Sequence, residues 1–309
     1  MTAVLGVDGG QTSIRVRCSE DERVIERAGV GRQDGDVAGA LTEAVADAWR
    51  QLGQPPLDRV VLGLTTAPVD RAESDRLAQL VARALGVAEV WVTDDAVTAH
   101  AGALSGRPGV SITAGTGVAC LAVPAVGAPR IIGGHGFLLG DEGGGYWIGR
   151  NGLRAALRAA DGRGARTTLE SAAERRFGPL ADVHVRLHDL ERPVPAIAAF
   201  APDVLAAADA DDEVACAIVD EATDELLTLA NAGAQWVGGG RAMVALGGPL
   251  LSKGTALRRR LEKRDEDHGA GLDLRDPEGS PLDGAIRLGV TGTLGPYRDL
   301  IHLWHRESA

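Results

Sequence analysis

Two acidic residues stand where apolar runs of the sequence end, and both could take part in chemistry. Asp8 follows the run Ala3–Val7, and Asp95 lies just beyond the run Val90–Val92. A carboxylate beside two glycines, as at Asp8, can hold Mg²⁺ directly or through water. A carboxylate beyond the carboxyl end of a strand can accept a proton from a substrate hydroxyl, which is the role of a general base. The alternative for Asp95 is that it caps the helix predicted to follow it.

The turn after Asp8 has the composition of a phosphate-binding loop. It separates two apolar runs and consists of Gly9, Gly10, Gln11 and Thr12. Apolar residues alternate with arginine directly afterwards, so we expect two strands joined by a hairpin. The glycines let the backbone approach a phosphate group, and the Thr12 hydroxyl can donate to a phosphate oxygen. An ordinary Gly-Gly hairpin turn is the alternative, and the residues alone leave both open.

Two further glycine turns follow apolar runs later in the chain. The first consists of Gly115, Thr116 and Gly117 and lies between two predicted strands, as the first hairpin turn does. We therefore expect it to bind phosphate as well. The second, Gly247-Gly248, follows the run Ala242–Leu246 and can lie against a nucleotide base or ribose. A tight strand-to-helix turn is the alternative for this second turn.

The stretch of residues 133–149, GGHGFLLGDEGGGYWIG, is the densest glycine segment of the chain and also holds Asp141 and Glu142. Glycine loses the most conformational freedom on folding, so this density indicates positive φ angles or close approach to a ligand. The segment runs into apolar residues that begin a predicted helix, whose first N–H groups can bind an anion or a hydroxyl. A flexible surface turn is the alternative, and the apolar residues 137–139 disfavour it.

The elements that would position these residues follow from hydrophobic periodicity. Up to residue 95 the predicted order is three strands, helix 37–52, strand 60–64, helix 77–85 and strand 90–92. This order predicts a mixed sheet flanked by helices. Strands 110–114 and 118–123 follow, then helices 148–160, 169–177, 194–208 and 214–229, strands 242–246 and 272–274, and helix 281–294. The two similar hairpins suggest two similar domains that face each other.

Composition excludes several classes of function. The chain has 309 residues, 45% of them hydrophobic, which suits two folded domains. Its net charge of −11 argues against nucleic-acid partners and against an anionic membrane surface. Three scattered cysteines favour neither a disulfide framework nor a zinc site. No signal peptide and no apolar run of about 20 residues is evident. We therefore expect a cytoplasmic protein.

Taken together, these turns resemble the BadF/BadG/BcrA/BcrD ATPase family, within the sugar kinase/Hsp70/actin superfamily, and in particular its N-acetylglucosamine kinase-like members. The matching stretches span nearly the whole chain in family order. They are GVDGGQTSIRV at 6–16, TDDAVTAHAG at 93–102, SITAGTGVACL at 111–121, GGHGFLLGDEGGGYWIG at 133–149 and ALGGPLLSKG at 245–254. Each loop alone is weak evidence, whereas the early DGGQT together with the GDEG…GYWIG block is specific.

The resemblance implies an α/β fold of two RNase H-like, actin-like ATPase domains with a nucleotide cleft between them. Residues 1–104, joined by 281–309, would form the N-terminal domain, and residues 105–280 the C-terminal domain with a helical insertion. The implied reaction transfers the γ-phosphoryl of ATP, with Mg²⁺ at Asp8, to the 6-hydroxyl of N-acetylglucosamine, and Asp95 matches the catalytic base. The family's phosphate contacts fall on Thr12 and Thr116 and its adenosine loop on Gly247 and Gly248. Its sugar contacts fall on Gly134, His135, Gly136 and Asp141, beside Glu142.

The chain departs from the family's pattern at the sugar pocket. Relatives usually have GGWGH where this chain has GGHGF, so His135 and Phe137 change the pocket's chemistry. The loop at 29–36, where relatives often have an asparagine, here holds Arg32-Gln33-Asp34. Glucosamine, N-acetylmuramic acid or a related sugar are therefore alternative substrates. A role as an ATPase activator is disfavoured, because this chain lacks the cysteines that such a role needs. A role as a non-catalytic nucleotide or sugar sensor is disfavoured by the presence of Asp95. A homodimer is left open, since the sequence does not determine the oligomeric state.

Overall fold

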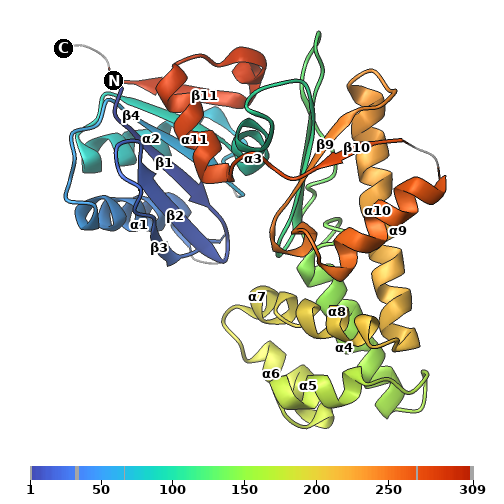
Figure 1. The fold of residues 1–309 in the computed structure, drawn as a ribbon. Coiled ribbons are helices and arrows are strands. Elements are labelled where there is room, and N and C mark those ends of the chain that lie inside the picture. The colour runs from blue at the N-terminus through green and yellow to red at the C-terminus, as the bar shows by residue number, and fades with distance from the viewer. Residues whose placement is uncertain (1, 32–34, 66, 269–270, 307–309) are drawn as a thin grey trace. The chain divides into compact units, whose positions relative to one another are not determined.

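The chain forms two compact units in a computed structural model, which describes residues 2–31, 35–65, 67–268 and 271–306 (Figure 1). Unit 1 comprises residues 1–111, 123–130 and 277–309, and unit 2 comprises residues 112–122 and 131–276. Each unit contains one β-sheet with helices packed on it. This arrangement confirms the predicted mixed α/β class. The predicted domain limits, 1–104 with 281–309 and 105–280, stay a prediction.

The six-stranded sheet of unit 1 has the order β11-β5-β4-β1-β2-β3. Its strands are β1 (Val4–Gly9), β2 (Ser13–Cys18), β3 (Ile25–Ala28), β4 (Arg59–Leu64), β5 (Glu89–Asp94) and β11 (Ile301–His305). The three central strands β1, β4 and β5 are parallel, and the others pair antiparallel with their neighbours. Because the central strands are parallel, their carboxyl ends meet at one edge, and we call this the carboxyl edge of unit 1.

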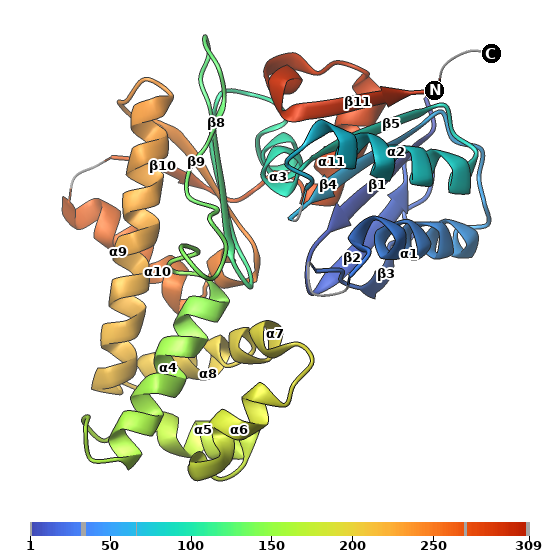
Figure 2. The same ribbon diagram turned by 180° about the vertical axis from the view of Figure 1, so that it is seen from behind.

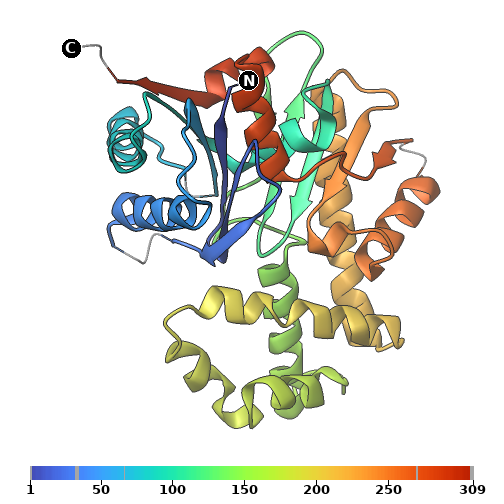
Figure 3. The ribbon, with the colours of Figure 1, turned by 60° about the vertical axis from the view of Figure 1, so that its left-hand side comes forward.

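Helices cover both faces of this sheet (Figure 3). On one face lie α1 (Val37–Gln51) and α2 (Arg71–Leu85), whose buried residues share a hydrophobic core with β1, β2, β4 and β5. On the other face lie α3 (Asp95–Leu104) and α11 (Pro281–Thr291). Asp36 and Asp70 cap α1 and α2 through their side chains, and Gly86 ends α2 in the left-handed conformation.

Small residues let α3 approach its neighbours closely. A Cβ on Gly63 of β4 would lie 2.3 Å from Thr98 Oγ1, and one on Gly284 of α11 would lie 1.9 Å from the Thr98 carbonyl oxygen. A Cβ on Gly102 would lie 2.1 Å from the carbonyl oxygen of Ser280. Only glycine allows these contacts. The helix that begins at Asp95 is therefore seated directly on β4 and α11.

Unit 2 has a five-stranded sheet of order β10-β9-β6-β7-β8. Its strands are β6 (Gly109–Ala114), β7 (Val118–Val123), β8 (Arg130–Ile131), β9 (Met243–Gly247) and β10 (Asp273–Arg275). By the limits given above, residues 109–111 of β6, Val123 of β7 and Arg130 of β8 are assigned to unit 1. The long helix α9 (Glu213–Trp236) packs against α10 (Ala256–His268) and α8 (Ala201–Asp209) (Figure 2).

The remaining helices of unit 2 gather around α4 (Gly145–Ala160) (Figure 2). They are α5 (Leu169–Phe177), α6 (Val183–His188) and α7 (Pro193–Ala198), together with α8. Phe200 is fully buried between α7 and α8 and meets Phe177 edge to face. Across the part of the chain that the structure describes, no single helix has the length and apolarity to cross a membrane, whereas the bent pair formed by 193–209 and 213–236 passes that test jointly.

Three details differ from the sequence prediction. The predicted helix 194–208 is two helices, α7 and α8, because Pro202 in the first turn of α8 lacks the N–H that a continuous helix would need. Ser252 follows the Gly247-Gly248 turn and by its residue type is a candidate cap for the next helix, but its hydroxyl donates to the carbonyl of Gly248. The Thr255 hydroxyl accepts from Arg258 N instead. The apolar residues Ile301, Leu303 and Trp304 indicate only that the C-terminal segment packs on the protein, whereas the segment forms a short 3₁₀ helix (Gly295–Leu300) and strand β11.

Candidate active site

The glycine turn after β1 lies at the carboxyl edge of unit 1. In the sheet register Gly9 is level with Leu64, and Leu64 is level with Asp94, so the turn and the ends of β4 and β5 share that edge. The turn is closed by a hydrogen bond from Gly10 N to Ser13 O (2.9 Å). A Cβ on Gly29 would lie 2.3 Å from the Gln11 carbonyl carbon, so glycine there is required by close backbone packing.

The two adjacent aspartates after β5 have separate roles. Asp94 is the N-cap of α3, and its Oδ1 accepts from Ala96 N at 2.9 Å. Asp95 is the first residue of the helix, and its Oδ2 accepts a hydrogen bond of 2.5 Å from the Thr65 hydroxyl. Capping of α3, which was the alternative role for Asp95, is therefore performed by Asp94. The side chain of Asp95 is left at the carboxyl edge with a hydroxyl as its partner.

The carboxylate of Asp95 disfavours the ionisation of two other acids near this edge, Asp8 and Asp94. The pKa of Asp8 is raised to about 6 by burial and by the Asp95 carboxylate, with Arg15 opposing both. The pKa of Asp94 is raised to about 7 by burial and by Asp95. Burial also raises the pKa of Asp95, whereas the Thr65 hydroxyl, the Asp94 side chain and main-chain N–H groups lower it. The edge therefore holds fewer negative charges at neutral pH than its sequence suggests.

The donor set at this edge suits a hard cation. Asp8 and Asp95 offer carboxylate oxygens, and a divalent ion there would relieve their mutual repulsion. Within the described residues no three His, Cys, Asp or Glu side chains gather into a site that could hold a metal by itself. Mg²⁺ commonly binds through one or two carboxylates and completes its shell with phosphate oxygens and water. The residues present fit that mode, with Asp8 as the predicted protein ligand.

In unit 2 the second glycine turn packs against the start of α4. Gly115 N donates to Gly117 O (3.0 Å), which closes the turn. Gly145 N and Tyr146 N donate to the carbonyls of Gly115 and Thr116, each at 2.8 Å. The sequence prediction that the first N–H groups of α4 are free for a ligand is thus wrong for these two. They are paired with the turn, and the helix start holds that turn in place.

Asp141 is fixed between this turn and α4. Its φ of 60° lies in the left-handed region, which is uncommon for a residue other than glycine and marks a conformation held by its surroundings. A Cβ on Gly117 would lie 2.3 Å from Asp141 Oδ2, so the carboxylate rests against the turn. Gly144 N donates to the Asp141 carbonyl at 2.9 Å. Three of the predicted stretches, 115–117, 141–142 and 144–146, are therefore brought together.

The third glycine turn, Gly247-Gly248, lies beside the Gly115–Gly117 turn. Gly248 has a φ of 84°, and a Cβ there would lie 2.3 Å from the carbonyl oxygen of Ala114, the last residue of β6. The turn after β9 is thus in backbone contact with the turn after β6. Both the predicted phosphate turn and the predicted adenosine turn belong to the same end of the unit 2 sheet.

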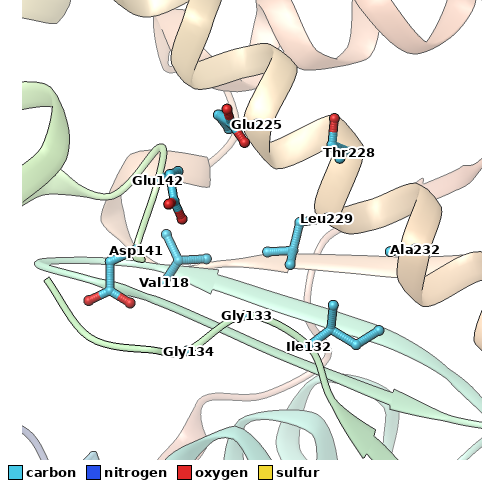
Figure 4. A pocket seen from close by; sticks show the side chains of 10 residues that line it. All are labelled: Val118, Ile132, Gly133, Gly134, Asp141, Glu142, Glu225, Thr228, Leu229 and Ala232. Carbon is cyan, nitrogen blue, oxygen red and sulfur yellow. The ribbon is translucent and has the colours of Figure 1, made fainter. Parts of the chain in front are cut away.

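A pocket of about 180 Å³ opens beside Asp141 in unit 2 (Figure 4). Its walls come from the 133–142 segment, β7 and α9, and its lining includes Gly133, Gly134, Asp141, Glu142, Glu225 and Leu229. Glu142 and Glu225 lie near each other on one side of it. Partial burial raises the pKa of Glu225, and the carboxylates of Glu142, Glu221 and Asp224 raise it further. The pocket wall is thus acidic, and the contribution of Glu225 was not predicted from the sequence.

The remaining predicted sugar residues lie in an open loop. His135 and Gly136 are exposed, and Leu138 and Leu139 are 80% and 83% exposed. Phe137 meets Tyr146 edge to face at 5.1 Å, so of the apolar residues 137–139 only this ring is tied to α4. The argument that their apolarity disfavours a surface turn is therefore wrong for both leucines. Arg32, Gln33 and Asp34, in the loop where relatives often have an asparagine, lie outside the described residues.

Comparisons with known proteins agree with the predicted fold class. A candidate N-acetylglucosamine kinase from Chromobacterium violaceum superposes with a TM-score of 0.72 at 26% identity, over 94% of this chain and 99% of that one. A second, from Porphyromonas gingivalis, gives 0.72 at 18% identity, over 95% and 100%. A ROK family glucokinase from Streptomyces griseus, solved with glucose and AMPPNP, gives 0.58 at 18% identity, over 94% and 98%. The shared fold confirms the predicted two-domain, actin-like architecture.

Sequence comparison gives the family. An N-acetylmuramic acid/N-acetylglucosamine kinase from Clostridium acetobutylicum is 32% identical over 178 residues, which are 55% of this chain. The matched region spans 58% of that relative's length. The model of the BadF/BadG/BcrA/BcrD ATPase family matches residues 5–287, nearly the whole chain. The resemblance inferred from the glycine turns is thereby confirmed, and the chain belongs to the BadF/BadG/BcrA/BcrD ATPase family.

Proposed function

We propose that the protein is an ATP-dependent amino-sugar kinase that phosphorylates the 6-hydroxyl of N-acetylglucosamine, with Asp95 as general base. The observation that carries this proposal is the placement of Asp95. Its carboxylate lies at the carboxyl edge of the three parallel strands of unit 1, level with the Gly9–Thr12 turn, and accepts the hydroxyl of Thr65. The names of the relatives from C. acetobutylicum and C. violaceum support the substrate class.

Phosphoryl transfer from ATP to a sugar hydroxyl requires little covalent chemistry from the protein. The proton of the sugar hydroxyl moves to Asp95 as the hydroxyl oxygen bonds to the γ-phosphorus, and the bond from that phosphorus to the ADP oxygen breaks. Positioning and charge neutralisation dominate such a transfer. The Gly9–Thr12 and Gly115–Gly117 turns would receive phosphate oxygens on main-chain N–H groups and threonine hydroxyls. Mg²⁺ held at Asp8 would supply the charge neutralisation.

The sugar would bind through Asp141 and the glycines of the 134–136 segment. Asp141 is held in a fixed conformation against Gly117, which suits a carboxylate that accepts hydrogen bonds from sugar hydroxyls. A second candidate substrate is glucosamine, and the acidic wall of the pocket favours it. Glu142 and Glu225 would face the ammonium group of a free amino sugar with opposite charge, whereas an acetamido group is neutral.

The test is an ADP-release assay with ATP, Mg²⁺ and a panel of glucose, glucosamine, N-acetylglucosamine and N-acetylmuramic acid. We expect sugar-dependent turnover with an amino sugar, a 6-phosphorylated product by NMR, and a loss of about 100-fold or more in kcat for Asp95→Ala and Asp95→Asn. Nucleotide binding, measured by calorimetry, should persist in both variants. ADP release that no sugar accelerates would contradict the proposal, as would wild-type turnover in both variants.

A further inference from the structure

We propose that Thr65 is a positioning residue for the phosphoryl transfer: its hydroxyl holds one carboxylate oxygen of Asp95 so that the other oxygen faces the substrate hydroxyl. This inference rests on the proposed function, and it adds a residue outside the glycine turns and acids discussed above. The contact is a hydrogen bond of 2.5 Å from Thr65 Oγ1 to Asp95 Oδ2, between side chains 30 residues apart.

The backbone places Thr65 for this role. It directly follows β4, the strand between β1 and β5, and its N–H donates to the Gly9 carbonyl at 2.9 Å, which extends the parallel ladder by one residue. A Cβ on Gly10 would lie 3.9 Å from Thr65 Oγ1, so the hydroxyl stands beside the first glycine turn. One side chain therefore links the turn that would receive phosphate with the carboxylate that would receive the proton.

The chemistry of the bond decides which oxygen of Asp95 can act. A threonine hydroxyl has one proton to donate, and here that proton goes to Oδ2. A carboxylate oxygen that already accepts a short bond is the poorer acceptor for a second proton, so the bond from Thr65 favours Oδ1 as the oxygen that receives the proton of the substrate hydroxyl.

A purely structural role for the contact is disfavoured, because the start of α3 is held by other groups. Asp94 caps the helix, and the Thr98 hydroxyl donates to the Asp95 main-chain carbonyl at 3.0 Å. The close approach of Thr98 to Gly63 seats the same turn of the helix on β4. Thr65 itself is exposed, so loss of its hydroxyl removes little packing. We therefore expect its substitution to change turnover without changing stability.

The experiment compares Thr65→Val, which removes the hydroxyl and keeps the shape, with Thr65→Ser, which keeps the hydroxyl. Thr98→Val is the matched control, because its hydroxyl is bonded to the main chain of Asp95 and not to the carboxylate. Thr65→Val should lower kcat about tenfold or more, with the KM for ATP unchanged. Thr65→Ser should retain most of the activity, and Thr98→Val should keep wild-type kcat. Melting temperatures of both Thr65 variants should match the wild type.

Each outcome bears on a distinct claim. If wild type and Thr65→Ser transfer no phosphate to any sugar, the proposed function fails. If the wild type is active and Thr65→Val matches it, the positioning role is overturned. Equal losses in Thr65→Val and Thr98→Val, or a lower melting temperature that accounts for the loss, would also overturn it. A crystal structure of Thr65→Val gives a readout independent of turnover, and the inference requires the Asp95 carboxylate to rotate from its wild-type orientation.

Discussion

His100 gives a prediction about stability that follows from its burial five residues after Asp95. The ring is fully buried on α3, and its Nε2 lies 3.2 Å from the carbonyl of Gly109 while its Nδ1 lies 2.7 Å from the hydroxyl of Tyr297. A neutral ring satisfies both contacts, with Nε2–H donating to the carbonyl and Nδ1 accepting from the hydroxyl. A proton on Nδ1 would displace the tyrosine donor. We therefore expect His100 to stay neutral in the folded protein.

The sign and size of the effect follow from linkage. Burial lowers the pKa of His100 from 6.5 to about 4. Above pH 6.5 the ring is neutral in both states, and its titration does not affect stability. As the pH falls from 6.5 to 4, the unfolded chain takes up a proton that the folded chain does not. Stability is therefore lost across this window, by about 3 kcal/mol in total, since each pH unit is worth about 1.4 kcal/mol.

The assay measures urea unfolding of the wild type and His100→Gln at pH 7.5, 6.5, 5.5 and 4.5. Glutamine does not titrate and keeps an N–H donor, so it serves as the control for the titration of the ring. We expect the variant to be less stable than the wild type at pH 7.5. Subtracting the two profiles cancels the opposite contribution of Asp8 and Asp94, whose raised pKa values favour the folded state as the pH falls. The stability difference should shrink by about 2 to 3 kcal/mol between pH 6.5 and 4.5. Parallel profiles, or an NMR titration of His100 above pH 6, would refute the reasoning.

Three further predictions test the packing and the pocket. Gly284→Ala should destabilise the protein by about 3 kcal/mol, because the new Cβ would lie 1.9 Å from a main-chain oxygen of α3; urea unfolding measures this, with the exposed Val290→Ala as control. Asp283→Ala should cost about 1 to 2 kcal/mol, since Asp283 completes the capping box of α11 and pairs with Arg17 at 2.6 Å; an unchanged melting temperature would contradict this. Glu225→Gln should raise the KM for glucosamine several-fold and leave that for N-acetylglucosamine unchanged, and equal changes for both sugars would exclude charge recognition by Glu225.

Much of the fold was predictable because its signals are local. The alternation of apolar residues predicts the hairpin of β1 and β2, and the apolar periodicity at 37–52 predicts α1. Strand β11 was not predicted, because its residues Ile301–His305 mix apolar side chains with two histidines and carry no clear period. The partner that makes this segment a strand is β5, more than 200 residues earlier, and such pairing leaves no mark in the local sequence.

The candidate site was predictable in its parts and not in its contacts. The residue types and their places after strands indicated Asp8, Asp95 and the three glycine turns. That the hydroxyl of Thr65 bonds Asp95 depends on the register of β4 against β5, which periodicity does not specify to one residue. Glu225 was missed for a similar reason, because on α9 it has the spacing of a solvated face. Only the approach of the 133–142 segment makes it part of a pocket.

The charge of the chain raises a further point, since a protein of net charge −11 is proposed to bind a polyphosphate. Burial and the Asp95 carboxylate raise the pKa of Asp94 to about 7, which lowers its negative charge near neutral pH. One oxygen of Asp94 caps α3 and one oxygen of Asp95 accepts the Thr65 hydroxyl, so part of the remaining charge is already compensated by N–H and O–H donors. Arg15 lies 3.7 Å from Asp8 and offsets a further part. The carboxyl edge of unit 1 can therefore bind phosphate groups without a basic patch. Hydrogen-bond donors and protonation reduce the negative electrostatic potential that its aspartates would otherwise create.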